Sequence, residues 1–185
     1  MKITKEKAAE NRQLLVETAA RLFREKGIDG VGVAEISKAA GLTHGALYAH
    51  FPSKDALAAE AMQFSTRSAF GKVTARPVTL QELIGYYLAP EQRDNLAEGC
   101  PLAAAASEVA RQDAAVAANY TSGYRQMVDY IRSRLPAGEG QQQQAQAIMA
   151  ALVGAISVSR NVYKSDPQLA DEVLESVRNL LSRMS

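Results

Sequence analysis

Apolar residues recur along the chain at intervals of three and four, the spacing of one face of an α-helix. Leu15, Ala19 and Leu22 mark the first such face. Other sets with this spacing are Val33, Ile36 and Ala40; Leu57, Ala61 and Phe64; and Leu169, Val173, Val177, Leu180 and Met184. No segment sustains the alternation of apolar and polar residues that is typical of a strand. The pattern predicts an all-α protein.

Residues that start and stop helices predict the element boundaries. Gly27 follows the basic turn 24–26 and should end a long first helix, while Gly41 should end a short one over 33–40. Pro52 should stop the next helix after Phe51. The predicted N-caps are Thr43, Ser53, Thr79 with Glu82 in a capping box, Asp113, and Asp166 ahead of Pro167. Residues 136–140 should form a loop.

The chain divides near residue 52. Residues 1–52 hold one helix of about 20 residues and two short helices, whereas residues 53–185 hold longer helices rich in Ala. We predict a small N-terminal domain, with a helix-turn-helix at about 32–51, followed by a larger helical domain.

The stretch 33–51 has the form of a helix-turn-helix, two short helices joined by a tight glycine turn. In this motif the second helix enters the major groove of DNA. A helical wheel turns Leu47 and Phe51 toward the core and leaves Gly45, Ala46 and Ala49 outside. Such small side chains let the backbone approach a groove closely, and an alanine methyl can contact a thymine methyl. An ordinary helical hairpin is the alternative.

Hydrogen-bond donors flank that small-residue face. Thr43, Tyr48, His50 and Lys54 can donate to phosphates, and Lys54 stands at a helix N-terminus, which itself favours anions. His44 occupies the exposed first turn.

Charge gives the DNA-binding hypothesis little support. The 185 residues include 21 Lys and Arg and 20 Asp and Glu, a net charge of +1, and residues 1–65 also carry a surplus of only +1. Lys2, Lys5 and Lys7 form either a basic arm or a solvated tail. With few charges to neutralise phosphates, binding should depend only weakly on salt.

Composition predicts an ordered, soluble, cytoplasmic protein. One cysteine excludes an intramolecular disulfide and suits a reducing compartment. The N-terminal residues 1–12 lack the apolar segment of a signal peptide. The apolar run 147–158 is shorter than the roughly 20 residues that cross a bilayer, so we expect a buried helix and no membrane partner.

Residues 41–57, Gly-Leu-Thr-His-Gly-Ala-Leu-Tyr-Ala-His-Phe-Pro-Ser-Lys-Asp-Ala-Leu, closely resemble the N-terminal motif of TetR/AcrR-type transcriptional regulators. The resemblance extends over about 10–62, where Ala19, Phe23, Gly27 and Ile36 also fall at family positions. It implies an all-α homodimer with a three-helix DNA-binding unit and a variable ligand-binding domain. Carried over by position, Thr43, Tyr48, His50 and Lys54 would contact phosphates, while His44, Gly45 and Ala46 would face bases.

Two positions depart from the family pattern. Val31-Gly32 stands where the family often has Ser or Thr, so a hydroxyl for a phosphate is absent. His44 replaces a residue that is often Lys, Arg or polar, which weakens any charge-based contact at neutral pH.

The last two predicted helices, over 141–163 and 167–184, are candidates for a dimer interface because small residues allow close helix contact. The interface candidates are Gly154, Val158, Val173, Val177, Leu180 and Leu181. Packing within one subunit is the alternative. A dimer matters because two recognition helices must lie about 34–36 Å apart to contact successive major-groove faces of a palindromic operator.

A ligand pocket is expected between the middle helices, where aromatic residues and methionine gather. The candidate ligand-binding residues are Tyr86, Tyr87, Tyr120, Tyr124 and Met127. Tyrosines at helical spacing also serve as ordinary core residues, which leaves both roles open. Gly123, inside the same helix, marks either a kink or a tolerated glycine.

Cys100 precedes Pro101, which we expect at the first position of a helix. A thiol at a helix N-terminus has a lowered pKa and is more reactive. Residues 99–102 also resemble a segment in a subgroup of these regulators, some of which sense oxidants or electrophiles through a cysteine. Cys100 is therefore a redox candidate, or else a small buried apolar residue.

Enzymatic function is not expected, because no nucleophile, base or metal-ligand spacing stands out. Both histidines lie on the predicted DNA-binding helix, far along the chain from Cys100. We predict no catalytic residues, no metal and no cofactor. The sequence predicts a homodimeric repressor that binds a palindromic operator in double-stranded DNA and is released by a small-molecule inducer. The alternatives are a repressor that senses electrophiles through Cys100, or a structural helical dimer.

Overall fold

The computed structural model describes residues 4–75 and 78–183, which contain helices and no strands, as the sequence predicts. Lys2 and Met184 lie outside the described residues. The elements are α1 (Lys5–Lys26), α2 (Val33–Ala39), α3 (His44–Tyr48), α4 (Lys54–Thr74), α5 (Leu80–Tyr87), α6 (Pro90–Asp94), α7 (Pro101–Ala105), a short 3₁₀ helix (Val109–Arg111), α8 (Ala114–Arg132), α9 (Gln141–Tyr163) and α10 (Pro167–Ser182).

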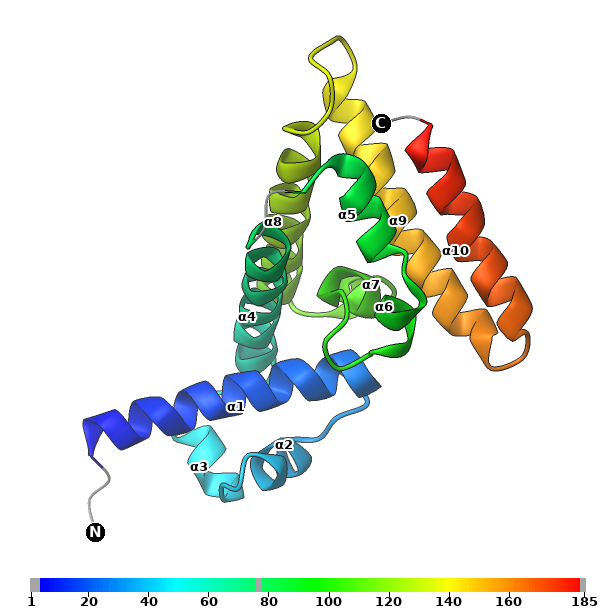
Figure 1. Ribbon diagram of the computed structural model, residues 1–185. Helices are drawn as coiled ribbons and strands as arrows, with labels where there is room; N and C mark the ends of the chain where they lie inside the picture. Colours follow the sequence, from blue (N-terminus) through cyan, green and yellow to red (C-terminus); the bar gives the residue numbers. More distant parts are fainter. Residues whose placement is uncertain (1–3, 76–77, 184–185) are drawn as a thin grey trace.

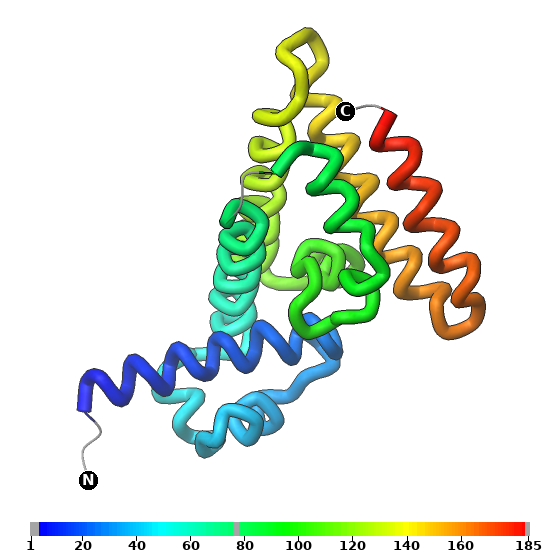
Figure 2. Tube along the Cα trace, in the orientation of Figure 1, coloured from blue at the N-terminus to red at the C-terminus, as the bar shows by residue number. Residues whose placement is uncertain are grey.

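Helices α1 to α3 form a unit at one end of the molecule, and α4 rises from it (Figure 1). Helix α4 packs along α8, and α8 packs on α9, which pairs with α10. The short helices α5 to α7 fill the space that these long helices enclose, as the trace in Figure 2 shows. Helix α4 thus connects the N-terminal unit directly to the larger helical domain.

Two clusters of buried apolar side chains stabilise this arrangement. The first joins α1, α2 and α3 to the first turns of α4, with Leu15, Ile36, Leu47 and Leu57 fully buried. The second joins α5, α8, α9 and α10. Because the start of α4 belongs to the N-terminal core, a movement of α4 is expected to carry that unit with it.

The predicted caps are present. Side-chain oxygens of Thr43, Ser53 and Asp166 each accept a backbone N–H from the first turn of α3, α4 and α10. Gly27 ends α1 with a φ of +80° and Gly41 lies in the turn after α2 with a φ of +68°, conformations that favour glycine.

One boundary prediction is wrong: the helix expected to continue to Phe51 ends at Tyr48. The N–H groups of both His50 and Phe51 donate to the carbonyl of Leu47, so the chain tightens into a turn one residue before Pro52. Pro52 disfavours the helical conformation only at Phe51, and the earlier end coincides with the i to i−3 hydrogen bond from His50 to Leu47.

Among the described residues, α9 alone has the length and apolar composition of a membrane-spanning helix. Its residues Ile148, Leu152 and Ile156 are fully buried in the second core. Core helices of soluble proteins have the same composition, and the packing of α9 between α8 and α10 accounts for its apolar residues.

Candidate DNA-binding surface and effector cavity

The turn between α2 and α3 presents one face of α3 to solvent. Leu47 and Phe51 are buried beneath it, as the wheel predicts. The Thr43 hydroxyl accepts the backbone N–H of Ala46 at 3.3 Å and fixes the start of α3. Leu42 N–H donates to the carbonyl of Ser37 at 2.8 Å, which ties the turn to α2. The orientation of α3 is therefore set by core packing and by two local hydrogen bonds.

The outer face of α3 carries most of the predicted DNA contacts. Thr43, His44, Gly45, Tyr48 and Ala49 are exposed. Ala46, His50 and Lys54 are half-buried at its margins, and Lys54 is the first residue of α4. The Tyr48 ring is 49% exposed and lies edge-on to the His44 ring, 5.3 Å between centroids. All seven predicted residues are exposed or half-buried and lie between the N-cap of α3 and the first residue of α4.

One contact behind this surface has no signal in the sequence. The Arg12 guanidinium in α1 lies over the Phe51 ring, 4.7 Å from its centroid, and pairs with Glu60 of α4. Arg12 therefore joins α1, the end of the helix-turn-helix and α4. The partners lie about 40 to 50 positions apart in the sequence, so no local pattern reveals them.

Three of the five predicted ligand-binding residues line one small cavity of about 50 Å³. Tyr86 and Tyr87 reach it from α5 and Met127 from α8. Apolar residues of α4 and α7 complete most of its wall; they are Ala69, Phe70, Val73, Pro101 and Leu102. The cavity lies between the middle helices, as expected, and α4 forms one side of it.

Tyr120 and Tyr124 do not line this cavity, contrary to the sequence prediction. The Tyr120 hydroxyl donates to the carbonyl of Leu102 at 3.3 Å, and the ring packs against both cores. The Tyr124 hydroxyl donates to the carbonyl of Gln146 at 3.2 Å, and its ring borders a separate cleft beside α9. Both tyrosines lie on α8, but on parts of its surface that do not border this cavity.

Cys100 is the N-cap of α7, with Pro101 at the first helical position as predicted. Its thiol lies in the cavity wall and accepts the Tyr87 hydroxyl at 2.6 Å. Burial raises the pKa of the Cys100 thiol, which is opposite to the lowering that a helix N-terminus would give. The sensing role stays a prediction, tested by comparing the DNA affinity of wild type and Cys100→Ser after treatment with an alkylating quinone.

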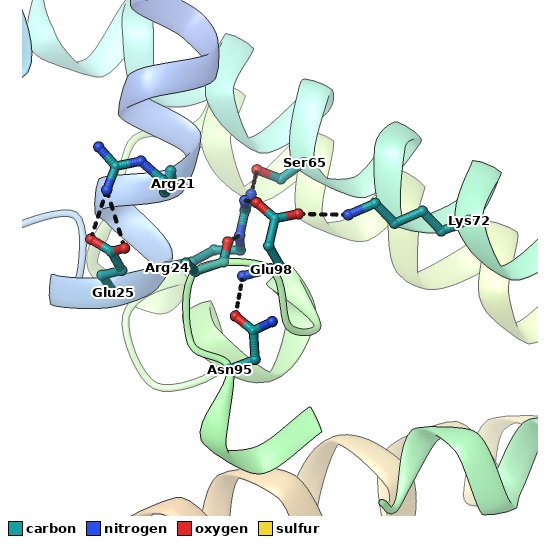
Figure 3. A network of polar contacts seen from close by, with 8 residues as sticks. Arg21, Arg24, Glu25, Ser65, Lys72, Asn95 and Glu98 are labelled. Atoms are coloured by element: carbon teal, nitrogen blue, oxygen red, sulfur yellow. Dashed lines mark hydrogen bonds and ion pairs between the residues drawn. The ribbon is translucent and has the colours of Figure 1, made fainter. Parts of the chain in front are cut away.

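A polar network joins α1, α4 and the loop between α6 and α7 (Figure 3). Arg24 of α1 donates to the carbonyl of Ala97 at 2.5 Å and to the Ser65 hydroxyl of α4 at 2.7 Å. Glu98 pairs with Lys72 of α4 at 2.6 Å and with Arg24 at 3.8 Å. The Lys72 hydrogen bond is the main cause of the lowered pKa of the Glu98 carboxyl. This network links the cavity wall to the N-terminal unit.

The candidate dimer residues fall into two groups. On α9 and α10, Val158 and Leu180 are exposed, at 47% and 59%. Gly154, Val173 and Val177 are half-buried at the same helices. Leu181 is buried in the core of its own subunit, so its predicted place at the interface is wrong: it lies on the inner side of α10.

The fold and the α3 surface define a helix-turn-helix protein with a helical domain behind it. Residues 15–61 match the family model described as "Bacterial regulatory proteins, tetR family". Over 62 residues the chain is 44% identical to the HTH-type transcriptional regulator AcrR of Shigella flexneri. That alignment covers 34% of this chain and 29% of the relative, so the sequence likeness spans less than a third of AcrR.

Solved structures extend the likeness to the whole fold. A TetR-family regulator from Agrobacterium tumefaciens, 18% identical, gives a TM-score of 0.75 over 96% of this chain and 99% of its own. The reduced form of E. coli NemR, 20% identical in sequence, gives a TM-score of 0.75 over 92% of this chain and 96% of its own. Residues 15–61 therefore have the sequence of a TetR-family helix-turn-helix segment, and the chain as a whole has the fold of these solved structures.

Proposed function

We propose that this chain is a cytoplasmic, homodimeric repressor that binds a palindromic DNA operator through α3 and leaves it when a small molecule occupies the cavity. Thr43, Tyr48, His50 and Lys54 would contact phosphates, and His44, Gly45 and Ala46 would face base edges. No cofactor takes part in this proposal.

The observation that carries the proposal is the exposed face of α3. Gly45 and Ala49 are exposed and have no charge, while Leu47 directly behind them is fully buried. A solvated surface helix ordinarily exposes charged residues. Small uncharged side chains on this face instead let the backbone of α3 approach a groove closely, and an alanine methyl can contact a thymine methyl.

Dimerisation through α9 and α10 supplies the second recognition helix. Val158, Tyr163, Leu169 and Leu180 leave large apolar side chains exposed on these two helices. Exposed apolar surface of this kind is typical of protein–protein contacts. Gly154 and the half-buried Val173 and Val177 would let a partner helix approach closely.

Release would act through α4. This helix lines the cavity with Phe70 and Val73, while its first turns, including Leu57, pack in the N-terminal core. A ligand that moves α4 would change the separation of the two recognition helices. A coupling free energy of roughly 1–3 kcal/mol would change DNA affinity 5–150-fold.

Fluorescence anisotropy with a mixed-sequence DNA duplex at low salt tests the assignment of α3. Ala49→Glu places a carboxylate on the face that would meet DNA, and we expect it to abolish binding while the protein remains folded. Ala118→Glu adds the same charge to an exposed alanine of α8 and should leave binding unchanged. Equal affinities of the two variants would remove α3 from the interface.

A further inference from the structure

The Lys72–Glu98 ion pair stands where the cavity meets two neighbouring clefts. Lys72 lines all three spaces. One cleft, of about 450 Å³, shares Lys72, Val73 and Tyr86 with the cavity. Together they lie within the 300–1,000 Å³ that a pocket for a small ligand typically has. A ligand with its body against these apolar walls would bring its polar end to Lys72.

Charges of both signs line these spaces: Arg21, Arg24 and Lys72 against Glu17, Glu82 and Glu98. The loop 95–100, termed the Glu98 loop, has Arg24 on one side and Arg160 of α9 on the other. Burial is the main cause of the lowered pKa of both guanidinium groups. Within the described part of the chain, Nη1 of Arg160 is buried with no hydrogen-bond partner. Beside the loop itself, Lys72, Arg24 and Arg160 adjoin a single carboxylate, Glu98, and this local excess of cations favours an added negative charge.

We propose that the effector is an organic acid with an apolar, aromatic or aliphatic body, whose anionic group takes Lys72 from Glu98. The proposal rests on the function proposed above and specifies the chemical class of its inducer. A carboxylate suits the site because a charge-assisted hydrogen bond to an ammonium group is among the stronger polar contacts.

Competition for Lys72 would also connect the ligand to the DNA-binding unit. Glu98 belongs to the loop whose Ala97 carbonyl accepts from Arg24 of α1. Further along the same segment, the Glu108 carboxylate accepts the backbone N–H of Ile28, just after α1. Release of Glu98 from Lys72 would loosen the hold of the Glu98 loop on α1 and α4 together. The acid would then act on DNA affinity through α1 as well as through α4.

Three probes with one body and different end groups test the class of ligand: phenylbutyrate, phenylbutanol and phenylbutylamine. Their affinities for the full chain are measured by isothermal titration calorimetry without DNA. We expect the acid to bind at least about tenfold more tightly than the alcohol, and the amine most weakly. Equal affinities, tighter binding of the amine, or no binding of any probe at millimolar concentration would overturn the proposal.

Substitutions test whether Lys72 and Glu98 cause the preference for the acid over the alcohol. Lys72→Gln should remove the advantage of phenylbutyrate over phenylbutanol, whereas Lys164→Gln, at an exposed lysine after α9, should retain it. Glu98→Gln should strengthen binding of the acid because the competing carboxylate is gone. If Lys72→Gln unfolds, as thermal melting would show, the wild-type probe series still decides.

Separate measurements keep the two proposals apart. If the protein selects an operator but shows no preference for the acid, the ligand class is wrong and the regulator function stands. If the acid binds through Lys72 but no DNA is bound, the regulator function is wrong.

Discussion

At the scale of single residues, the neighbouring side chains of Leu47 and Tyr48 in α3 have different roles: one packs in the core and the other is available for contact with DNA. Leu47 is fully buried and holds the helix, whereas Tyr48 projects into solvent with half of its surface exposed. An exposed tyrosine contributes little to folding, so its removal separates the effect on DNA binding from any effect on stability.

Tyr48→Ala should weaken binding to every DNA sequence alike, because a contact to phosphate carries no sequence information. The loss of one hydrogen bond to a charged group is about 1.5 kcal/mol, or about tenfold in affinity for each half-site. Anisotropy titrations with two unrelated duplexes measure the loss, and a thermal melt checks the fold. Unchanged affinity would remove Tyr48 from the interface.

At the scale of elements, helix ends follow local chemistry. In the capping box of α5, Glu82 accepts from both the backbone N–H and the hydroxyl of Thr79, at 2.8 and 2.9 Å. These hydrogen bonds favour the ionised carboxylate and lower the pKa of Glu82. The stabilisation is therefore present above the ordinary pKa of a glutamate and is lost as the pH falls through the lowered value.

An NMR titration of the Glu82 carboxyl should accordingly give a pKa below that of an ordinary glutamate. In Thr79→Ala the hydroxyl is gone while the backbone N–H remains, so the pKa should move part of the way back. An ordinary pKa for Glu82 in the wild-type protein would show that the capping box does not form in solution.

The contact between α4 and α8 depends on Gly123. A Cβ atom at this position would lie 2.5 Å from Cγ2 of Thr66, so the glycine allows the two helices to approach closely. The sequence leaves two roles open for Gly123, a kink or a tolerated glycine. The close approach to Thr66 is a third role, because it requires the absence of a side chain.

Gly123→Ala should destabilise the protein by about 1–3 kcal/mol through overpacking, although alanine favours helices. Gly71→Ala, in an exposed part of α4 with no atom within 4 Å of the added Cβ, should instead stabilise it by up to about 1 kcal/mol. Chemical denaturation measures both changes. The same sign for the two variants would contradict the packing of α4 on α8.

The sequence predicts these elements well where their cause is local. Caps such as Thr43 and Ser53, and the glycine turn at Gly41, act over three or four residues and are visible in the sequence. The pairing of Arg24 with Glu98 joins residues more than 70 positions apart and has no local pattern. The side of the helix on which Tyr124 and Leu181 lie likewise depends on how whole helices pack, so the sequence does not predict that Tyr124 borders a different cleft or that Leu181 is buried.

At the scale of the whole molecule, α4 packs against both cores and connects the unit formed by α1 to α3 with the cavity. Its start packs with α1, and Phe70 and Val73 near its end pack against the second core. A dimer formed through α9 and α10 would place the DNA-binding units of its two subunits symmetrically on DNA.

Leu180→Glu tests that dimer. The side chain is 59% exposed on α10, so a charge there should leave the subunit folded and oppose association. Leu96→Glu makes the same change at a leucine that is 39% exposed between α6 and α7, and should leave the dimer intact. Light scattering after size exclusion gives the mass; a dimer for Leu180→Glu would exclude this face as the interface.

In the proposed complex, two copies of α3 bind one palindromic operator. The most direct test is a selection of the purified protein on random duplex DNA at about 0.1 M salt, a concentration at which surface electrostatics are screened beyond about 10 Å. We expect recovery of a palindrome whose half-sites lie about 10 base pairs apart or a multiple of that distance. Recovery of no shared sequence by folded, dimeric protein would exclude this mode of DNA binding.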